Sequence, residues 1–490
     1  MRTYIFTYCL ALLLVTILTP IVIDWARKRN LMDKPSARKI HKTPIARVGG
    51  IAIFCGAVLA IIPVILIDNH VGEVFRERVL QIVALLIACT VMFLVGLYDD
   101  LKKAHVHTKL GAQVFAALVV CAAGIHVESI HIREMGSLHL GWFGYVITFV
   151  WIIGITNAVN LIDGLDGLAA GIVAIASGFM ALMAILQGTV VLAVIMVALF
   201  GSLTGFLFFN FHPAKIFMGD CGSLFLGFTI ATATIMTASK AEALVGIGLP
   251  ILVLGIPIFD TLLSILRRFI NRRGIMSPDR GHFHHRLIDM GLKQHHVAVI
   301  AYAMTASISG FGLFMLLTRS TMSITMLVAC IALILLIFRM AGSVELHRSI
   351  EGISKRRALH NEQRKDRKKF EEAQLQLQNA KTFDQWWDCL CKAAQALEFN
   401  RLCLELNNDG FSEKILAWSA DASEMTEDAD QILEELLQVK IPLKRNNNGQ
   451  RGCIEIQVLP NGSLECAGRR IALFTRLTDE YSIDGAANSQ

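Results

Sequence analysis

The chain has 490 residues, of which 54% are hydrophobic and only 18% are charged, and its formal net charge is +6. Soluble globular proteins have roughly 25% charged residues, so this composition excludes a single water-soluble domain. The charges are also unevenly divided, with 42 in residues 1–340 and 44 in the much shorter segment 341–490. The sequence therefore predicts a membrane-embedded body followed by a soluble tail.

Apolar runs of roughly 17–25 residues, which can cross a bilayer as helices, follow one another through the body. We identify eleven of them, at 3–23, 49–68, 79–98, 109–126, 142–159, 168–186, 189–209, 222–238, 243–266, 297–318 and 321–340. The first run has no strong basic start and no clear cleavage site, so we expect a retained span rather than a signal peptide. The predicted fold class is an all-α polytopic membrane protein with a small α+β C-terminal domain.

The distribution of Lys and Arg predicts the orientation, because short cytoplasmic loops are enriched in these residues. The loops that follow the odd-numbered runs contain 19 Lys and Arg, whereas the opposite side contains 6. This places the N-terminus outside and, after eleven spans, the tail in the cytoplasm.

Polar segments interrupt the body on this basic side, and the first of them is rich in cations. Residues 33–41 include Arg38, Lys39 and His41, and the pair Gly49-Gly50 follows. These side chains suit a phosphate group, and nonspecific binding of lipid headgroups is the alternative.

Two adjacent carboxylates, Asp99 and Asp100, end the third run, and Lys109 follows them. Neighbouring acids at a membrane surface are costly without a cation nearby. They could bind a divalent metal ion, one of them could act as a base, or they could form a solvated helix end.

The segment 157–168 interrupts apolar sequence with Asn157, Asn160, Asp163 and Asp166. Amide and carboxylate oxygens are ligands for a hard cation, and the neighbouring glycines let a ligand approach the backbone closely. The alternative is a loop in which an Asp caps the next helix. The start of the eighth run offers the same choice between a cap and a metal ligand at Asp220.

The last polar segment combines histidine with arginine, which suits a phosphate-rich ligand. Its members are Arg280, His282, His284, His285 and Arg286. A structural zinc site is a weaker alternative, because no Cys lies nearby. Asp260 lies inside the ninth run, where an acid is either functional or a polar link between helices.

One membrane face thus combines carboxylates and amides with many cations. Mg²⁺ prefers oxygen ligands together with substrate phosphates, while His and Arg can neutralise the remaining charge. This chemistry favours phosphoryl transfer on a metal–diphosphate substrate. The sequence contains neither a G-x-x-x-x-G-K-[ST] nor a G-x-G-x-x-G motif, so we expect no P-loop or Rossmann mode of phosphate binding.

In this order the motifs resemble those of the polyprenyl-phosphate N-acetylhexosamine-1-phosphate transferases, over about residues 20–340. The resemblance implies transfer of a sugar 1-phosphate from a UDP-sugar to a polyprenyl phosphate, with Mg²⁺ or Mn²⁺ as cofactor and UMP as the second product. The run His282-Phe283-His284-His285 differs from the His-His-His motif of the branch that uses UDP-MurNAc-pentapeptide. The chain therefore looks like the UDP-GlcNAc branch.

The resemblance also implies partners and a location. The partners are UDP-GlcNAc, undecaprenyl phosphate and the lipid bilayer, with no nucleic acid and with a homodimer left open. The protein would lie in a bacterial inner membrane with its active site toward the cytoplasm. It would start a cell-envelope polysaccharide such as O-antigen, enterobacterial common antigen or teichoic acid.

Residue roles follow from matching each motif to the family. The catalytic set is Asp99, Asp100, Asp163, His282, His284 and His285. The substrate-binding set is Arg38, Lys39, His41, Lys109, Asn157, Asn160, Asp166, Arg280 and Arg286. The metal-binding set is Asp220, Asp99 and Asn160. We expect a single displacement at the sugar-bearing phosphorus, and a covalent aspartyl intermediate is the alternative.

The tail is predicted to contain a charged helical linker at 341–380 and a cytoplasmic α+β accessory domain at 381–490. An amphipathic helix is expected at 381–400, and alternating residues predict strands at 402–406 and 453–458. The accessory domain shows no catalytic constellation, and its partner is unknown; a sensor role and an assembly role are both open.

Other functions remain as alternatives for the whole chain. The same chemistry could use another UDP-HexNAc or UDP-MurNAc-pentapeptide as the donor. A transporter would place its charges near the middle of the membrane, often on broken helices. A membrane scaffold for a cytoplasmic sensor domain would leave the polar segments unexplained.

Overall fold

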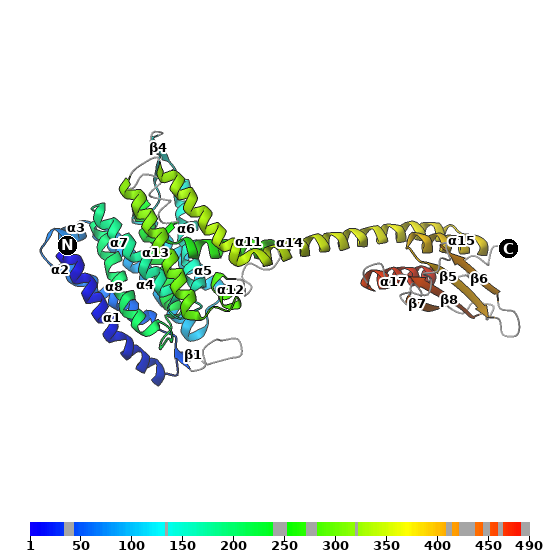
Figure 1. Cartoon of the computed structure of the whole chain (residues 1–490), viewed down its shortest axis with the longest axis horizontal. Helices are drawn as coiled ribbons and strands as arrows, with labels where there is room; N and C mark the ends of the chain where they lie inside the picture. Colours follow the sequence, from blue (N-terminus) through cyan, green and yellow to red (C-terminus); the bar gives the residue numbers. More distant parts are fainter. Residues whose placement is uncertain are drawn as a thin grey trace. The chain divides into compact units, whose positions relative to one another are not determined.

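The computed structural model describes residues 1–33, 44–132, 136–238, 252–270, 282–318, 322–407, 414–420, 437–443, 451–458 and 464–481 (Figure 1). The chain divides into two compact units, Met1–Ser349 and Ile350–Gln490. Each unit has its own hydrophobic core. The long helix α14 (Met322–Gln378) includes the boundary between them.

The first unit is built from helices. In chain order they are α1 (Arg2–Lys28), α2 (Gly50–Leu66), α3 (His70–Glu77), α4 (Val79–Lys102), α5 (Val106–Ala122), α6 (Trp142–Ile162), α7 (Leu168–Leu186), α8 (Val190–Asn210), α9 (Gly219–Ala238), α11 (Gly255–Ile270), α12 (Phe283–Asp289), α13 (Gln294–Thr318) and the start of α14. Two short antiparallel ribbons occur between helices, β1 (Met32–Asp33) with β2 (Ile45–Ala46) and β3 (Ser129–Ile132) with β4 (Gly136–His139).

Seven helices within the described ranges are long and apolar enough to cross a membrane, namely α1, α4, α6, α7, α8, α9 and α13. The pair α2 and α3, bent by 105° at a short break, would add an eighth. Two predicted spans fall on shorter elements, 109–126 on the 17-residue α5 and part of 243–266 on the 16-residue α11. The structure is that of a multi-pass membrane protein, and the count of eleven spans remains a prediction.

Helix α9 is the most enclosed of these spans, with 89% of its apolar window buried compared with 28% for α1. It packs along α4 and α6, and glycines allow its backbone to be approached closely. A Cβ atom on Gly96 of α4 would lie 2.3 Å from the carbonyl oxygen of Asp220. One on Gly50 of α2 would lie 2.2 Å from the backbone nitrogen of Gly222. Small residues thus fix the start of α9 against two neighbouring helices.

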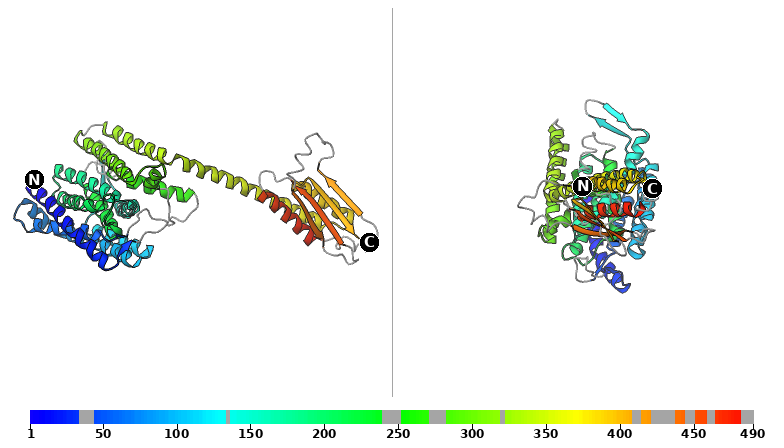
Figure 2. Two further views of the ribbon diagram at one scale, coloured as in Figure 1. Left: turned by 60° about the horizontal axis from the view of Figure 1, so that its bottom comes forward. Right: turned by 90° about the vertical axis from the view of Figure 1, so that its right-hand side faces the viewer.

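The second unit is a small α+β domain (Figure 2). Its sheet has the order β6 (Lys414–Ser419), β5 (Arg401–Asn407), β8 (Arg451–Val458) and β7 (Leu437–Leu443), and all neighbouring strands are antiparallel. The predicted strands at 402–406 and 453–458 correspond to β5 and β8.

Alternation along these strands places one face of the sheet against helices. Leu402 pairs with Ile456 in the register, and Leu404 pairs with Ile454. All four side chains are buried with residues of α15 (Phe383–Ala396) and α17 (Leu464–Glu480). Phe370, Ala373 and Leu377 at the end of α14 belong to the same core. The predicted domain bounds of 341–380 and 381–490 remain predictions.

Candidate active site

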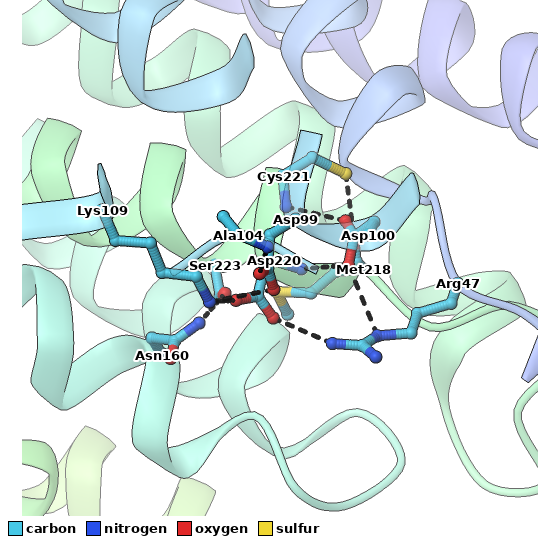
Figure 3. Close-up of polar contacts among 10 residues, drawn as sticks. All are labelled: Arg47, Asp99, Asp100, Ala104, Lys109, Asn160, Met218, Asp220, Cys221 and Ser223. Atoms are coloured by element: carbon cyan, nitrogen blue, oxygen red, sulfur yellow. Dashed lines mark hydrogen bonds and ion pairs between the residues drawn. The ribbon is translucent and has the colours of Figure 1, made fainter. Parts of the chain in front are cut away.

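A carboxylate at the end of α4 contacts the backbone at the start of α9 (Figure 3). The carboxylate of Asp100 accepts hydrogen bonds from the backbone nitrogens of Asp220 and Cys221, each at 2.9 Å. The first residue of α9 is Gly219, whose φ of +70° favours glycine and whose Cβ would lie 2.5 Å from Asp100 Oδ2. Asp100 therefore caps the helix that presents Asp220.

A guanidinium group lies against the same two acids. Arg47, which directly follows β2, places Nε 3.3 Å from Asp100 Oδ1 and Nη2 3.0 Å from Asp220 Oδ1. The side chain of Asp100 is completely buried, and both of its oxygens are engaged by these donors. This acid is therefore occupied in holding other groups in place.

The ammonium group of Lys109 lies between two carboxylates from different helices. Its Nζ is 2.9 Å from Asp99 Oδ2 and is in direct contact with Asp220 Oδ2. The other oxygen of Asp99 accepts a hydrogen bond of 2.7 Å from the backbone nitrogen of Ala104. Asp99 and Asp220 thus converge on one cation, as Figure 3 shows.

Amide side chains at the end of α6 lie beside this cluster. Asn160 donates a hydrogen bond of 2.8 Å to Ser223 Oγ on α9. Asn157 and Gln113 of α5 exchange two hydrogen bonds, at 3.0 and 3.2 Å. Asn160 is therefore held next to the acids, whereas Asn157 links α6 to α5.

The two acids of the α6–α7 loop have different surroundings. Burial, followed by the carboxylates of Asp220 and Asp100, raises the pKa of Asp163 to about 8. Asp166 instead lies 2.7 Å from Nδ1 of His212 and accepts a hydrogen bond from the backbone nitrogen of Ala214. The structure thus joins Asp163 to the acidic cluster and Asp166 to the α8–α9 loop.

The histidines of α12 approach that same α6–α7 loop. A Cβ atom on Gly164 would lie 3.0 Å from Nε2 of His284. Burial lowers the pKa of His284 to about 3, so its ring is neutral at physiological pH. The ring of His285 is 4.4 Å from that of His284 between centroids, and that of His282 is 5.8 Å away.

Asp260 of α11 is paired with this histidine cluster. Its Oδ2 lies 3.0 Å from His282 Nδ1, and its Oδ1 accepts a hydrogen bond of 2.7 Å from the backbone nitrogen of Phe283. This contact joins α11 to a motif histidine at the start of α12, so it fits both interpretations predicted for this acid, a functional one and a polar link between helices.

The structure says less about the remaining predicted site residues. Arg38, Lys39, His41 and Arg280 lie outside the described residues. Arg286 lies on α12 and is half-buried. Arg47, Gln113 and Ser223 were not predicted to be functional; a signal for Arg47 was its position two residues before Gly49-Gly50.

The oxygen donors of this cluster bear on whether it could hold a divalent cation. Among the described residues, no group of three or more His, Cys, Asp or Glu side chains has the arrangement of an assembled metal site. Asp99, Asp100 and Asp220 nevertheless share only two cations in the contacts above, Lys109 and Arg47. Carboxylate oxygens that already converge on an ammonium ion fit Mg²⁺, which prefers oxygen ligands.

A bundle of membrane-spanning helices with acids, amides, cations and histidines at neighbouring helix ends defines a membrane enzyme for a phosphorylated substrate. The sequence model described as Glycosyl transferase family 4 matches residues 82–238. The chain is 38% identical over 296 residues to a Bacillus subtilis (strain 168) protein named as a probable undecaprenyl-phosphate N-acetylglucosaminyl 1-phosphate transferase, covering 60% of this chain and 80% of that protein.

Two further relatives show the breadth of the group. An undecaprenyl-phosphate alpha-N-acetylglucosaminyl 1-phosphate transferase of Yersinia pestis is 29% identical over 316 residues, covering 63% of this chain and 82% of that protein. A phospho-N-acetylmuramoyl-pentapeptide-transferase of Bacillus subtilis (strain 168) is 31% identical over 332 residues, covering 64% and 98%. The chain belongs to glycosyl transferase family 4, the polyprenyl-phosphate N-acetylhexosamine-1-phosphate transferases, and is a phosphotransferase. The predicted family is confirmed.

Proposed function

We propose that the protein transfers GlcNAc-1-phosphate from UDP-GlcNAc to undecaprenyl phosphate, giving undecaprenyl-diphospho-GlcNAc and UMP. The observation that supports it best is the convergence of Asp99 and Asp220 on the ammonium group of Lys109. The names of the Bacillus and Yersinia relatives support the donor and the acceptor.

The proposed reaction is a single displacement. An oxygen of the lipid phosphate attacks the phosphorus that bears GlcNAc, and the bond to the bridging oxygen breaks so that UMP leaves. Lys109 and Arg47 supply positive charge to the incoming phosphates, because both lie at the acidic cluster where the substrates would meet. Asp100 is unsuited to be a covalent nucleophile, since its oxygens accept backbone and guanidinium hydrogen bonds.

The proposed cofactor is Mg²⁺ or Mn²⁺, held by Asp99 and Asp220 with the side-chain oxygen of Asn160. When bound, such an ion neutralises diphosphate charge and stabilises the leaving phosphate. Lys109 would then exchange its carboxylate partners for substrate phosphate. Asp163 would ionise more readily, because a nearby cation favours the charged form of an acid.

The other donors and functions are less well supported. Of the two Bacillus subtilis relatives, the one named for the muramoyl-pentapeptide donor is 31% identical to this chain and the GlcNAc-type one is 38% identical. We place the active site on the cytoplasmic face of a bacterial inner membrane because the basic loops lie on that side. The reaction would be the initiating step in the assembly of a cell-envelope polysaccharide such as O-antigen, enterobacterial common antigen or teichoic acid.

A transfer assay tests the proposal. Membranes that contain the protein are supplied with labelled UDP-GlcNAc and undecaprenyl phosphate. We expect the label to enter organic-extractable lipid only with Mg²⁺ or Mn²⁺, with release of UMP and with inhibition by tunicamycin. Membranes with the Asp220→Asn variant are the negative control. The absence of a lipid product from every UDP-HexNAc offered would refute the proposed function.

A further inference from the structure

Asp260 and His282 form a buried pair whose two residues come from different helices. Asp260 lies on α11, and His282 is the residue that precedes α12. Their side chains are only 5% and 7% exposed, so water screens the contact weakly. Such a pair is expected to have a defined geometry.

The two oxygens of Asp260 have separate tasks. Oδ1 accepts a hydrogen bond from the backbone nitrogen of Phe283 and so caps α12. Helix capping therefore accounts for one of the two carboxylate oxygens. Oδ2 lies 3.0 Å from His282 Nδ1, a contact that the cap does not need. A carboxylate can only accept, so this contact places a proton on Nδ1 and leaves Nε2 as the remaining polar atom of the ring.

The oriented ring lies within the active-site cluster. The rings of His282 and His284 are nearly parallel, with centroids 5.8 Å apart and an interplanar angle of 5°. His284 in turn lies against Gly164, the neighbour of Asp163. The imidazole that Asp260 holds thus lies beside a histidine that approaches the α6–α7 loop.

We propose that Asp260 is a positioning residue, which fixes the ring orientation and the protonated nitrogen of His282 so that the lone pair of Nε2 is available to accept a hydrogen bond from a hydroxyl or amide N–H group of the sugar nucleotide. This inference rests on the proposed transferase function. A carboxylate behind a histidine has this role in many enzyme sites, because it selects the tautomer and prevents ring rotation.

The Asp260→Asn variant separates this role from helix capping. The side-chain oxygen of Asn can still accept a hydrogen bond from the backbone nitrogen of Phe283. Its NH₂ group, which would then face His282 Nδ1, cannot accept a hydrogen bond from that nitrogen. We expect kcat for GlcNAc-1-phosphate transfer to fall about 10–100-fold while KM for UDP-GlcNAc stays within about twofold. The thermal unfolding midpoint should stay unchanged. The matched control is Asp289→Asn, the same change at an exposed position on α12, which should retain wild-type kinetics.

A double-mutant cycle decides whether Asp260 acts through His282. In a His282→Asn background, Asp260→Asn should reduce the rate by no more than about twofold further, because the partner is already missing. A full additional loss in that background would overturn the proposal. So would a fall in kcat that is explained by a lower unfolding midpoint and appears equally in Asp260→Asn and Asp260→Ala.

Nitrogen-15 NMR of histidine-labelled protein tests the pairing without transferase activity, because the shifts of the two ring nitrogens report which one carries the proton. We expect the Nδ1–H tautomer at His282 in the wild-type protein and a change toward the Nε2–H tautomer in Asp260→Asn, because the amide group no longer accepts at Nδ1. His295 and His296 on α13 are internal controls. Identical ring-nitrogen shifts at His282 in both proteins would refute the pairing, whereas an inactive wild-type protein with the expected tautomer change would refute only the proposed function.

Discussion

Acids that look equivalent in the sequence have different surroundings in the folded protein. Asp99 and Asp220 each direct an oxygen to Lys109, whereas the oxygens of Asp100 accept from the backbone at the start of α9. Only the first two converge on the ammonium group of Lys109. The tertiary contacts therefore give Asp99 a contact with Lys109 and give Asp100 the capping of α9, and metal binding at Asp99 is part of the proposed function.

Substitution of Asp220 should distinguish these roles from those of Asp100. Asp220→Asn removes a charged ligand, so we expect transfer to fall about 100-fold or more, with a higher Mg²⁺ concentration for half-saturation. Asp100→Asn keeps one acceptor for the α9 backbone and should be less damaging. Initial rates across a Mg²⁺ titration measure both effects; equal losses for the two variants would contradict the assignment.

The pKa of about 8 at Asp163 predicts how metal affinity depends on pH. The folded-state pKa is raised, so this group is protonated below pH 8 and ionised above it. Because Mg²⁺ favours the ionised form, its affinity should increase as the pH rises from 6 to 9, by up to about tenfold per pH unit below the pKa. Metal titration of the purified protein measures this, and Asp163→Asn should flatten the dependence.

At the scale of elements, close helix packing positions the site. Gly96 and Gly50 allow α4 and α2 to meet α9 at its first residues, next to Asp220. The acids of α4 and α9 can converge only because these backbones approach each other. A defect in packing should therefore reduce activity as well as stability.

Replacement of Gly96 by Ala tests this connection. The added Cβ would lie 2.3 Å from the Asp220 carbonyl oxygen, so we expect a loss of about 1–3 kcal/mol in stability together with reduced transfer. Gly154→Ala on α6 is the control, because its Cβ would have no atom within 4 Å. Thermal unfolding and transfer rates in the same detergent compare the two variants.

At the scale of the whole molecule, the candidate site and the second unit have separate cores. Every described site residue belongs to the first unit, while Leu404 is fully buried in the second. Leu404→Ala should destabilise the second unit by about 2–5 kcal/mol. We expect faster proteolysis within residues 381–490 and an unchanged transfer rate in membranes. A parallel loss of transfer would show that the two units are coupled.

The sequence by itself determined the family and the membrane body, and it predicted most of the described residues that meet at the candidate site. It could do so because apolar runs and ordered polar motifs are local properties of the chain. The roles of Asn157 and Asp166 could not be read in this way, since their partners Gln113 and His212 are distant in sequence. Arg47 was missed because its partners Asp100 and Asp220 are distant in sequence, although its position before Gly49-Gly50 was a local signal.

Only the tertiary structure decided which acids share a cation and which hold a helix in place. Asp99 and Asp100 are adjacent, so periodicity and composition treat them alike, yet their side chains leave α4 in different directions. The pairing of Asp260 with His282 likewise depends on the packing of α11 and α12, across 22 positions of sequence. Such assignments depend on distances between elements, which a sequence pattern does not specify.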